Sequence, residues 1–370
     1  MKFSIQRESI LKPLQIITGV VERRQTLPVL SNLLLSVSSD RVSMTTTDLE
    51  VEMIASVPLN GAEAGDGDIT LPARKLVDIC KALPEGAQID IVYDEEKERA
   101  IIKSGRSRFN LATLPVSEFP NIEEVKGVFE FQVPQKVLKQ LIEKTAFAMA
   151  QQDVRYYLNG LLLEVDSGMV RTVATDGHRL AICEHEADVS PGEKIQVILP
   201  RKGVMELARL LSDSDEPVKV MVGNNHLSMV LEDYAFTSKL IDGKFPDYQR
   251  VIPRDSDKDV TADHELLKQA LVRTSILSNE KYRGIRLRLQ DGLIQAQANN
   301  PEMEEAEEEI EVQYTGPKLE IGFNVSYLLD ALNVIDTPNV TLALGDANSS
   351  CVMRPEGQTA CTYVIMPMRL

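Results

Sequence analysis

Hydrophobic residues recur at helical spacing in six separate stretches of this chain. In the first stretch, residues 7–24, apolar side chains stand three and four residues apart, from Ile10 through Leu14 and Ile17 to Val21, which places them on one face of a helix. The other stretches with this spacing are residues 72–83, 134–155, 200–211, 263–283 and 324–335. The pattern therefore predicts six amphipathic helices.

Short alternating runs of apolar and polar residues separate these helices. Residues 41–45, 50–57, 88–92 and 99–102 alternate in this way, as strands with one buried face do. Each helix is accompanied by one strand before it and several after it, so the chain reads as six half-units of the same design. We expect an α+β architecture in which helices pack on antiparallel sheets.

The chain also repeats itself at an interval of about 128 residues. The segment Thr47–Leu49 recurs as Thr175–Gly177, and Leu71–Lys75 recurs as Leu199–Gly203. A fainter third copy follows in phase, and its last mark is Met366-Pro367 near the end of the sequence. One interval at several separated marks indicates three repeated domains, which we place at residues 1–126, 127–250 and 251–370.

Charge is distributed unevenly between the helices and the rest of the chain. The sequence has 40 basic and 56 acidic residues and a formal net charge of −16, which by itself argues against a nucleic-acid partner. The six helical stretches, however, contain 18 basic and 10 acidic residues. Repeated half-units would turn the polar faces of their helices to one side, so we expect a basic helical surface within an acidic exterior.

Helix dimensions connect this surface to DNA. Six helices about 10 Å wide, closed into a ring, leave a bore of about 9 Å, and twelve leave about 28 Å. A DNA duplex, roughly 20 Å across, fits only the wider ring. Twelve helices require two chains, so the sequence favours a homodimer that closes around double-stranded DNA, and two-fold assemblies are the commonest kind.

Four motifs resemble one family over the whole chain. The segments Gln152–Gly160, Ala174–Leu180, Phe245–Tyr248 and Met366–Leu370 are similar to those of the bacterial DNA polymerase III beta subunits, the sliding clamps. The resemblance implies three like clamp domains and a head-to-tail dimer forming a closed ring. It also implies a function in chromosomal replication and repair: tethering the replicative polymerase and other proteins to DNA.

The resemblance also assigns residues to three sites. Contact with duplex DNA, independent of base sequence, and with single-stranded DNA is expected at Arg24, Arg74, Gln152, Arg155, Tyr156, Tyr157, Arg201 and Lys202. A pocket for short linear peptides of DNA polymerases, the clamp loader and repair proteins is expected at Leu158, Thr175, Gly177, His178, Arg179, Leu180, Pro246, Arg250, Val251, Val364, Met366, Pro367, Met368, Arg369 and Leu370. The dimer interface is expected at Lys75, Arg106, Arg108, Ile276, Leu277, Glu302, Glu304 and Glu305. The resemblance also places Asn348 near the pocket, at a position where the family's better-known members have an apolar residue.

The remaining features argue against other classes of protein. We expect no membrane segment, no signal peptide and a cytoplasmic location. The cysteines Cys80, Cys183, Cys351 and Cys361 have no metal-binding spacing, and we expect them to be reduced packing residues. We expect no metal and no cofactor, since His178 and His185 lack a supporting carboxylate cluster.

Two alternatives to a DNA clamp remain at this point. A hydrolase could use Asp176 and His178, but the chain has neither a GxSxG elbow nor a GxxxxGK[ST] phosphate loop. A scaffold that binds only proteins would need just the pocket, and the basic helices argue against it.

Overall fold

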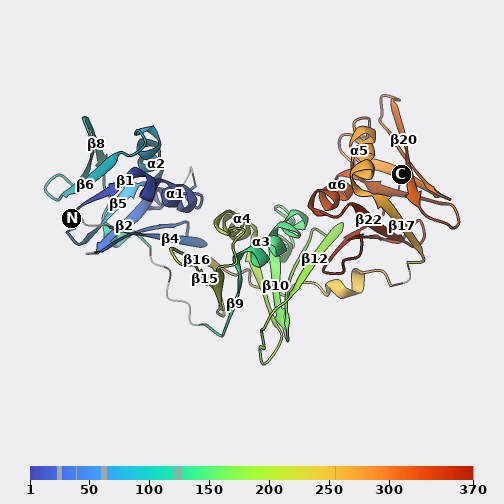
Figure 1. Ribbon diagram of the computed structural model, residues 1–370, viewed down its shortest axis with the longest axis horizontal. Coiled ribbons are helices and arrows are strands. Elements are labelled where there is room, and N and C mark those ends of the chain that lie inside the picture. The colour runs from blue at the N-terminus through green and yellow to red at the C-terminus, as the bar shows by residue number, and fades with distance from the viewer. Residues whose placement is uncertain are drawn as a thin grey trace. The chain divides into compact units, whose positions relative to one another are not determined.

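One pattern, a strand followed by a helix and three strands, occurs six times along the chain. It is seen in a computed structural model that describes residues 1–22, 27–38, 40–59, 65–120, 122, 127–254 and 256–369. All strand pairs in the sheets are antiparallel, and the described residues form two compact units. The predicted α+β class and the six predicted helices are confirmed (Figure 1).

Unit 1 comprises Met1–Lys136 and Lys202–Leu240. A four-stranded sheet has the order β1-β6-β7-β8, with β1 at Lys2–Gln6, β6 at Gln88–Asp94, β7 at Arg99–Ser104 and β8 at Ser107–Ala112. An eight-stranded sheet has the order β5-β2-β3-β4-β16-β15-β14-β9. Its strands are β2 (Asn32–Ser38), β3 (Arg41–Thr47), β4 (Val51–Pro58), β5 (Gly67–Pro72), β9 (Phe129–Pro134), β14 (Pro217–Val222), β15 (His226–Val230) and β16 (Tyr234–Lys239).

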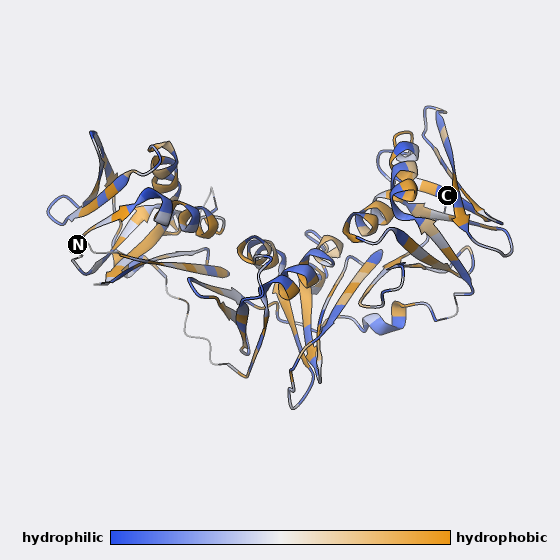
Figure 2. Ribbon diagram, viewed as in Figure 1, coloured by the Kyte–Doolittle hydropathy of each residue, from blue (hydrophilic) through white to orange (hydrophobic). Residues whose placement is uncertain are grey.

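The helices of unit 1 bury the faces that the sequence pattern predicts. Helices α1 (Arg7–Ile17) and α2 (Ala73–Ala82) lie side by side, and α1 packs on β3 and β4 through Ile10, Leu14 and Ile17. Helix α4 (Arg201–Leu210) buries Val204 and Leu207. Figure 2 shows the hydrophobic residues gathered along the sheet strands and on the helix sides that face them.

Unit 2 comprises Val137–Arg201 and Ile241–Leu370. Its twelve-stranded sheet has the order β13-β10-β11-β12-β24-β23-β22-β17-β20-β19-β18-β21. The strands are β10 (Gly160–Asp166), β11 (Met169–Thr175), β12 (Arg179–Glu186), β13 (Ile195–Pro200), β17 (Lys258–Asp263), β18 (Gly284–Gln290), β19 (Leu293–Asn299), β20 (Glu305–Gln313), β21 (Leu319–Asn324), β22 (Asn339–Leu344), β23 (Cys351–Pro355) and β24 (Cys361–Ile365). The helices are α3 (Gln135–Glu143, which begins at the end of unit 1), α5 (His264–Ser275) and α6 (Val325–Val334).

The sheets continue from one repeat into the next. Strand β4 of the first repeat pairs with β16 of the second, and β12 of the second repeat pairs with β24 of the third. The second repeat is therefore shared between the two units. Strand pairing, rather than order along the chain, sets the limits of each compact unit.

Several helices are shorter than the sequence pattern predicts. The stretch 134–155 was expected to be helical, but α3 ends at Glu143, and the chain tightens into a 3-10 turn at Ala146–Ala148. The Thr145 hydroxyl there donates to the Leu141 carbonyl at 2.7 Å. A hydroxyl that binds the backbone in this way offers an alternative to the next helical hydrogen bond.

Candidate functional site

The turn between β11 and β12 has a fixed backbone set by two side chains. Asp176 Oδ1 accepts hydrogen bonds from the backbone N–H groups of His178 (2.9 Å) and Arg179 (3.0 Å), and the Thr175 hydroxyl accepts from Gly177 N–H at 3.1 Å. Gly177 has φ +88°, a conformation that suits glycine. A Cβ at this position would stand 2.9 Å from the Arg155 guanidinium, so glycine also leaves room for that side chain.

This turn forms one side of a cavity of about 160 Å³ in unit 2. The cavity is lined by Arg155, Tyr157, Leu158, Thr175, Gly177, Arg179, Leu180, Pro246, Asp247, Tyr248, Val251, Val364 and Met366. Nine of the residues predicted for the peptide pocket are therefore brought together: Leu158, Thr175, Gly177, Arg179, Leu180, Pro246, Val251, Val364 and Met366. Arg155 and Tyr157, which the sequence assigned to DNA, also line it, as do Asp247 and Tyr248, which the sequence analysis missed.

The cavity has an apolar floor and a partly exposed apolar rim. Leu158, Leu180 and Val364 on its floor are buried. On the rim, Val251 is 42% exposed and Met366 is 38% exposed. A small apolar pocket with a few polar groups at its edge is typical of a site that takes apolar side chains of a ligand.

Arg179 is a structural member of this site rather than a free cation. Its guanidinium donates to Asp176 Oδ2 at 3.1 Å, to the carbonyl oxygen of Phe147 at 2.8 Å, and to Asp330. It also lies over the rings of Phe147 (5.3 Å) and Tyr327 (4.7 Å), an arrangement that attracts a cation. The sequence analysis missed Phe147, Tyr327 and Asp330.

The other residues predicted for the pocket lie outside this cavity. The His178 ring stacks on Tyr327 with 6.3 Å between centroids, and Arg250 pairs with Asp247 at 2.8 Å. Met368 and Arg369 line a different, polar cavity of about 750 Å³ beside β18 and β19. Pro367 and Asn348 line neither cavity, and Leu370 lies outside the described residues.

An exposed loop before β10 contains four of the residues predicted to contact DNA. Tyr156 is 58% exposed and makes an edge contact with Tyr157 at 5.8 Å, and Gln152 is exposed with φ +55°. Arg155 donates to Asp153 at 2.9 and 3.0 Å. The hydrogen bonds from Arg155 lower the pKa of Asp153 to about 2, so the pair is ionised near neutral pH.

The predicted cations on helices α2 and α4 are engaged within the protein. Arg74 donates to the Val21 carbonyl at 2.5 Å, and Arg201 donates to the Met149 carbonyl at 3.4 Å. The Lys202 ammonium binds Glu22 at 2.6 Å and also Asp48. Burial alone would lower the pKa of Lys202, but these two carboxylates raise it. Arg24 lies outside the described residues.

The residues predicted for a dimer interface are exposed or half-buried. Ile276 follows α5 and is 73% exposed, and the neighbouring Leu277 is half-buried. The charged members are exposed on α2, on β8 and its hairpin, and on β20 and the turn before it: Lys75, Arg106, Arg108, Glu302, Glu304 and Glu305.

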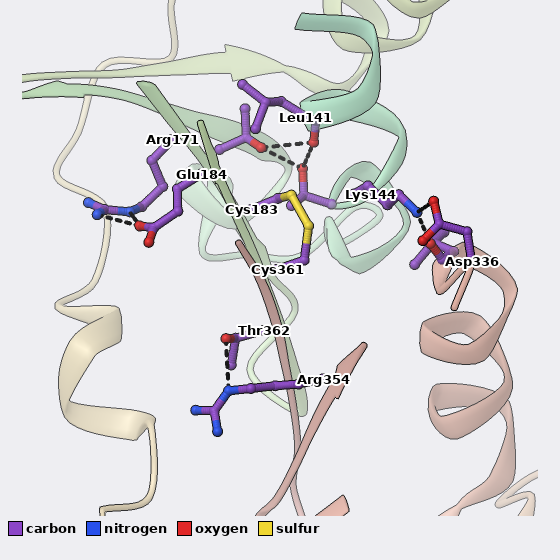
Figure 3. The surroundings of a disulfide bond; sticks show 12 residues. Leu141, Lys144, Arg171, Cys183, Glu184, Asp336, Arg354, Cys361 and Thr362 are labelled. Carbon is purple, nitrogen blue, oxygen red and sulfur yellow. Dashed lines mark hydrogen bonds and ion pairs between the residues drawn. A yellow bond between two sulfur atoms is a disulfide. The ribbon is translucent and has the colours of Figure 1, made fainter. Parts of the chain in front are cut away.

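The prediction that all four cysteines are reduced is wrong for two of them. Strands β12 and β24 place Cys183 opposite Cys361, and the two are joined by a disulfide with 4.1 Å between their Cα atoms (Figure 3). No local pattern indicated this pairing, because 178 residues separate the two cysteines. Cys80 and Cys351 are free and buried, as predicted, and burial raises their pKa values to about 11 and about 12.

The structure also bears on metal binding and membrane insertion. Among the described residues, His, Cys, Asp and Glu side chains form no group of three that could hold a metal ion. In the same residues, every helix is too short or too polar to cross a bilayer.

Comparison with known proteins assigns the chain to a family. Models of the DNA polymerase III beta subunit match in three parts: the N-terminal domain at residues 1–123, the central domain at 132–247 and the C-terminal domain at 249–369. The beta sliding clamps of Pseudomonas aeruginosa and Escherichia coli K12 are 57% and 51% identical over the whole of both chains. A solved Pseudomonas aeruginosa sliding clamp bound to griselimycin matches over both full chains with 56% identity and a TM-score of 0.96. The chain therefore belongs to the DNA polymerase III beta subunit family and is a three-domain sliding clamp of DNA replication.

Proposed function

We propose that two copies of this chain form a closed ring around duplex DNA and tether the polymerase without catalysing a reaction. The proposal divides each chain into domains at residues 1–126, 127–250 and 251–370, close to the three family matches. Confinement by a ring makes each rebinding of a tethered polymerase intramolecular. We include a cytoplasmic location in this proposal because DNA replication takes place there in bacteria.

The main support for a dimer is that, among the described residues, two strands, β8 and β20, lack the pairing that the other equivalent strands make. The last strands of the half-units are β4, β8, β12, β16, β20 and β24. Within the chain, β4 pairs with β16 and β12 pairs with β24. By the same rule β20 should pair with β8, but β8 pairs only with β7, and β20 pairs with β19 and, at two residues, with β17 among the described residues. A second copy could supply the missing partner to each strand.

Charge and apolar surface support this pairing. Strand β20 has the sequence EAEEEIEVQ, whereas β8 and its hairpin contain Arg106 and Arg108. Opposite charges guide the register of such an interface. The exposed Ile276, beside Leu277, would form its apolar centre.

The DNA contacts follow from the need to slide. A ring that moves along a duplex needs phosphate contacts, which carry no sequence information, and no direct contact with base edges. The loop with Gln152, Arg155, Tyr156 and Tyr157 is the most exposed of the predicted sets. Arg24, Arg74, Arg201 and Lys202 remain part of the proposal, although Lys202 would have to exchange a carboxylate for a phosphate.

The apolar cavity of unit 2 is the proposed docking site for partners. Short linear peptides from DNA polymerases, the clamp loader and repair proteins would place apolar side chains on Leu180 and Val364. His178, Arg250, Pro367, Met368, Arg369 and Leu370 would contact the rest of such a peptide. Met366 at the rim is flexible and polarizable, which suits a site with several ligands. Griselimycin, which a relative binds, is the probe that we propose for this pocket.

A topological experiment tests the ring. The chain is loaded with a clamp loader and ATP onto nicked circular DNA, and one sample is then cut to linear DNA. A ring stays on the circle and runs off the linear ends, as measured by gel filtration. Equal retention on both would contradict the ring and favour a protein scaffold with ordinary surface binding.

A variant pair tests the interface separately. Ile276→Ala with Leu277→Ala should yield monomers in sedimentation, because the apolar centre is lost. Leu266→Ala, which truncates an exposed apolar residue on the preceding helix α5, is the control and should leave the dimer intact. A dimeric double variant would contradict the assignment of the apolar centre.

A further inference from the structure

One wall of the apolar pocket is made by a connection between strands rather than by a strand. Residues 240–257 join β16 to β17, and the described part of this connection contains one 3-10 turn, Tyr248–Val251. This connection supplies Pro246, Asp247, Tyr248 and Val251 to the pocket lining. Its position therefore depends on what anchors it to the sheet.

Two buried aromatic residues anchor the connection, and one of them has a polar tie. Phe245 and Tyr248 are 7% and 6% exposed and pack with Leu162, Leu180 and Val364. The Tyr248 hydroxyl donates to Glu164 Oε1 at 3.0 Å, and the Arg171 guanidinium lies 3.3 Å from the same hydroxyl oxygen.

Glu164 is a fully buried carboxylate on β10 that is saturated with donors. Its side chain has no exposed surface, and it accepts from Arg171, from Lys194 at 2.8 Å, from Gln196 at 2.7 Å and from Tyr248. Burial alone would raise the pKa of Glu164, but the hydrogen bonds from Lys194, Gln196 and Tyr248 lower it. Burial raises the pKa of Tyr248 to about 12, so the phenol remains a donor to an ionised acceptor.

We propose that Tyr248 is a positioning residue whose hydrogen bond to the buried Glu164 carboxylate sets the pocket wall before a ligand binds. This inference rests on the proposed peptide-binding function of the pocket. Arg171 supports the arrangement from the other side, because it also donates to Glu184 at 2.6 and 2.8 Å and so holds the acceptor in place.

Preorganisation links this hydrogen bond to affinity. If the pocket wall already has its bound position, no free energy of binding is spent on ordering it. If the wall is loosened, a smaller fraction of the protein has the conformation that binds the ligand. A hydrogen bond to a charged group is among the stronger hydrogen bonds in a protein. Loss of this bond should therefore weaken ligand binding by about tenfold or more.

A matched pair of Tyr→Phe variants tests the inference with griselimycin as the probe. Tyr248→Phe keeps the buried ring and removes only the hydroxyl, so its Kd should rise about tenfold. Tyr314→Phe is the control, since Tyr314 is equally buried in unit 2 and donates to the Pro317 carbonyl at 2.8 Å, but it lies outside the pocket lining. Its Kd should stay within about twofold of wild type. Equal Kd values for Tyr248→Phe and wild type, or equal losses in both variants, would overturn the inference.

A second variant separates positioning from a general loss of structure. Glu164→Gln keeps an acceptor oxygen but removes the charge, so it should weaken binding less than Tyr248→Phe. Combined with Tyr248→Phe it should add little, because both changes act on one hydrogen bond. Fully additive losses would overturn the route through Glu164. If Tyr248→Phe does not fold, Glu164→Gln decides alone: an unchanged Kd overturns the inference and a raised Kd supports it.

The failure of the pocket assignment is distinguishable from the failure of this inference. Met366→Glu places a charge on the apolar rim and should abolish griselimycin binding if the probe occupies the pocket. Tight binding by Met366→Glu, or no binding by the wild type, would overturn the pocket assignment and, with it, the inference. Loss of binding by Met366→Glu together with a wild-type Kd for Tyr248→Phe would overturn only the inference.

Discussion

The two units bury carboxylates in opposite ways. In unit 2, Glu164 is fully buried and accepts hydrogen bonds from four side chains, of which Lys194, Gln196 and Tyr248 lower its pKa. In unit 1, Glu52 on β4 and Glu206 on α4 are 7% and 5% exposed, and each has one oxygen without a hydrogen-bond partner among the described residues. Burial raises the pKa of both. A buried carboxylate thus either stays ionised among donors or shifts toward its neutral form.

Glu164 is a buried charge that organises a site, whereas Glu52 and Glu206 are buried carboxyl groups that the fold tolerates. Through its hydrogen bonds, Glu164 on β10 connects β11, the start of β13 and the connection that forms one wall of the pocket. Among the residues that the structure describes, Glu206 accepts a side-chain hydrogen bond from Arg209 alone, at 2.7 Å, and its other oxygen lies against Gly19, where a Cβ would stand 2.2 Å away. Substitutions should therefore have unequal effects in the two units.

The largest effect is expected for Glu164→Ala. Removing the carboxylate leaves Arg171 and Tyr248 without their shared acceptor, and the loss of one partner from a buried ion pair costs about 3 kcal/mol. Hydrogen exchange in β10 and β11 should report that loss of stability in unit 2, with the strands of unit 1 unchanged as the internal control. Unchanged protection in β10 would contradict the view that this charge organises unit 2.

A gain in stability is expected for Glu52→Gln. The amide keeps an acceptor for the Ile122 backbone group that contacts Glu52 and removes a charge that burial disfavours. We expect unit 1 to be more stable by about 1 kcal/mol near neutral pH, measured by urea unfolding. A loss of similar size would mean that an ionised Glu52 has a partner in solution.

A smaller effect is expected for Glu206→Gln. Relief of the buried charge is offset by the weaker hydrogen bond to Arg209, whose side chain is 65% exposed. Exposed partners contribute little, so unit 1 stability should change by less than about 0.5 kcal/mol. A loss above that, in the same urea measurement, would show that the Arg209 pair stabilises α4.

The buried carboxylates of the two units should contribute to the pH dependence of stability with opposite signs. Glu52 and Glu206 have raised pKa values, so their neutral forms favour folding, and this contribution falls as pH rises above the ordinary value of 4.5. Glu164 has a lowered pKa, so its contribution is present above 4.5 and is lost as pH falls through its folded value. Hydrogen exchange of the wild type and of Glu52→Gln, Glu206→Gln and Glu164→Gln on both sides of pH 4.5 isolates each contribution, and contributions of the same sign would contradict the comparison.

Much of the fold could be predicted from the sequence because its periodicity is local. The spacing of Ile10, Leu14 and Ile17 identifies α1, and the repeat of Thr47–Leu49 at Thr175–Gly177 identifies equivalent turns. Both turns have a residue at positive φ, Leu49 and Gly177. Helix ends were less predictable, because the end of α3 depends on a hydroxyl of Thr145 that also contacts Thr172 on β11 at 3.0 Å.

The candidate site could be predicted only in part, because its contacts join distant segments. The resemblance identified Leu180 and Met366, which lie in the motifs Ala174–Leu180 and Met366–Leu370, and Val364, which lies just before the second motif. Phe147, Tyr327 and Asp330 had no local signal, since they become relevant only when Arg179 reaches them across the sheet. The resemblance assigned Arg155 to DNA contact alone, and no local pattern indicated that its guanidinium also faces the turn at Gly177.

Strands β8 and β20, which in the described part of the chain lack the partner expected from the repeat pattern, make the assembly of two molecules sensitive to dilution. The junctions β4–β16 and β12–β24 are backed by an unbroken polypeptide, so strands that separate remain near each other and rejoin in a first-order step. In the proposed ring, two molecules that have separated at both β8–β20 junctions have no such link, and their rejoining is second order in protein. The fraction of the protein that is assembled off DNA should therefore depend on how much of the protein a cell contains.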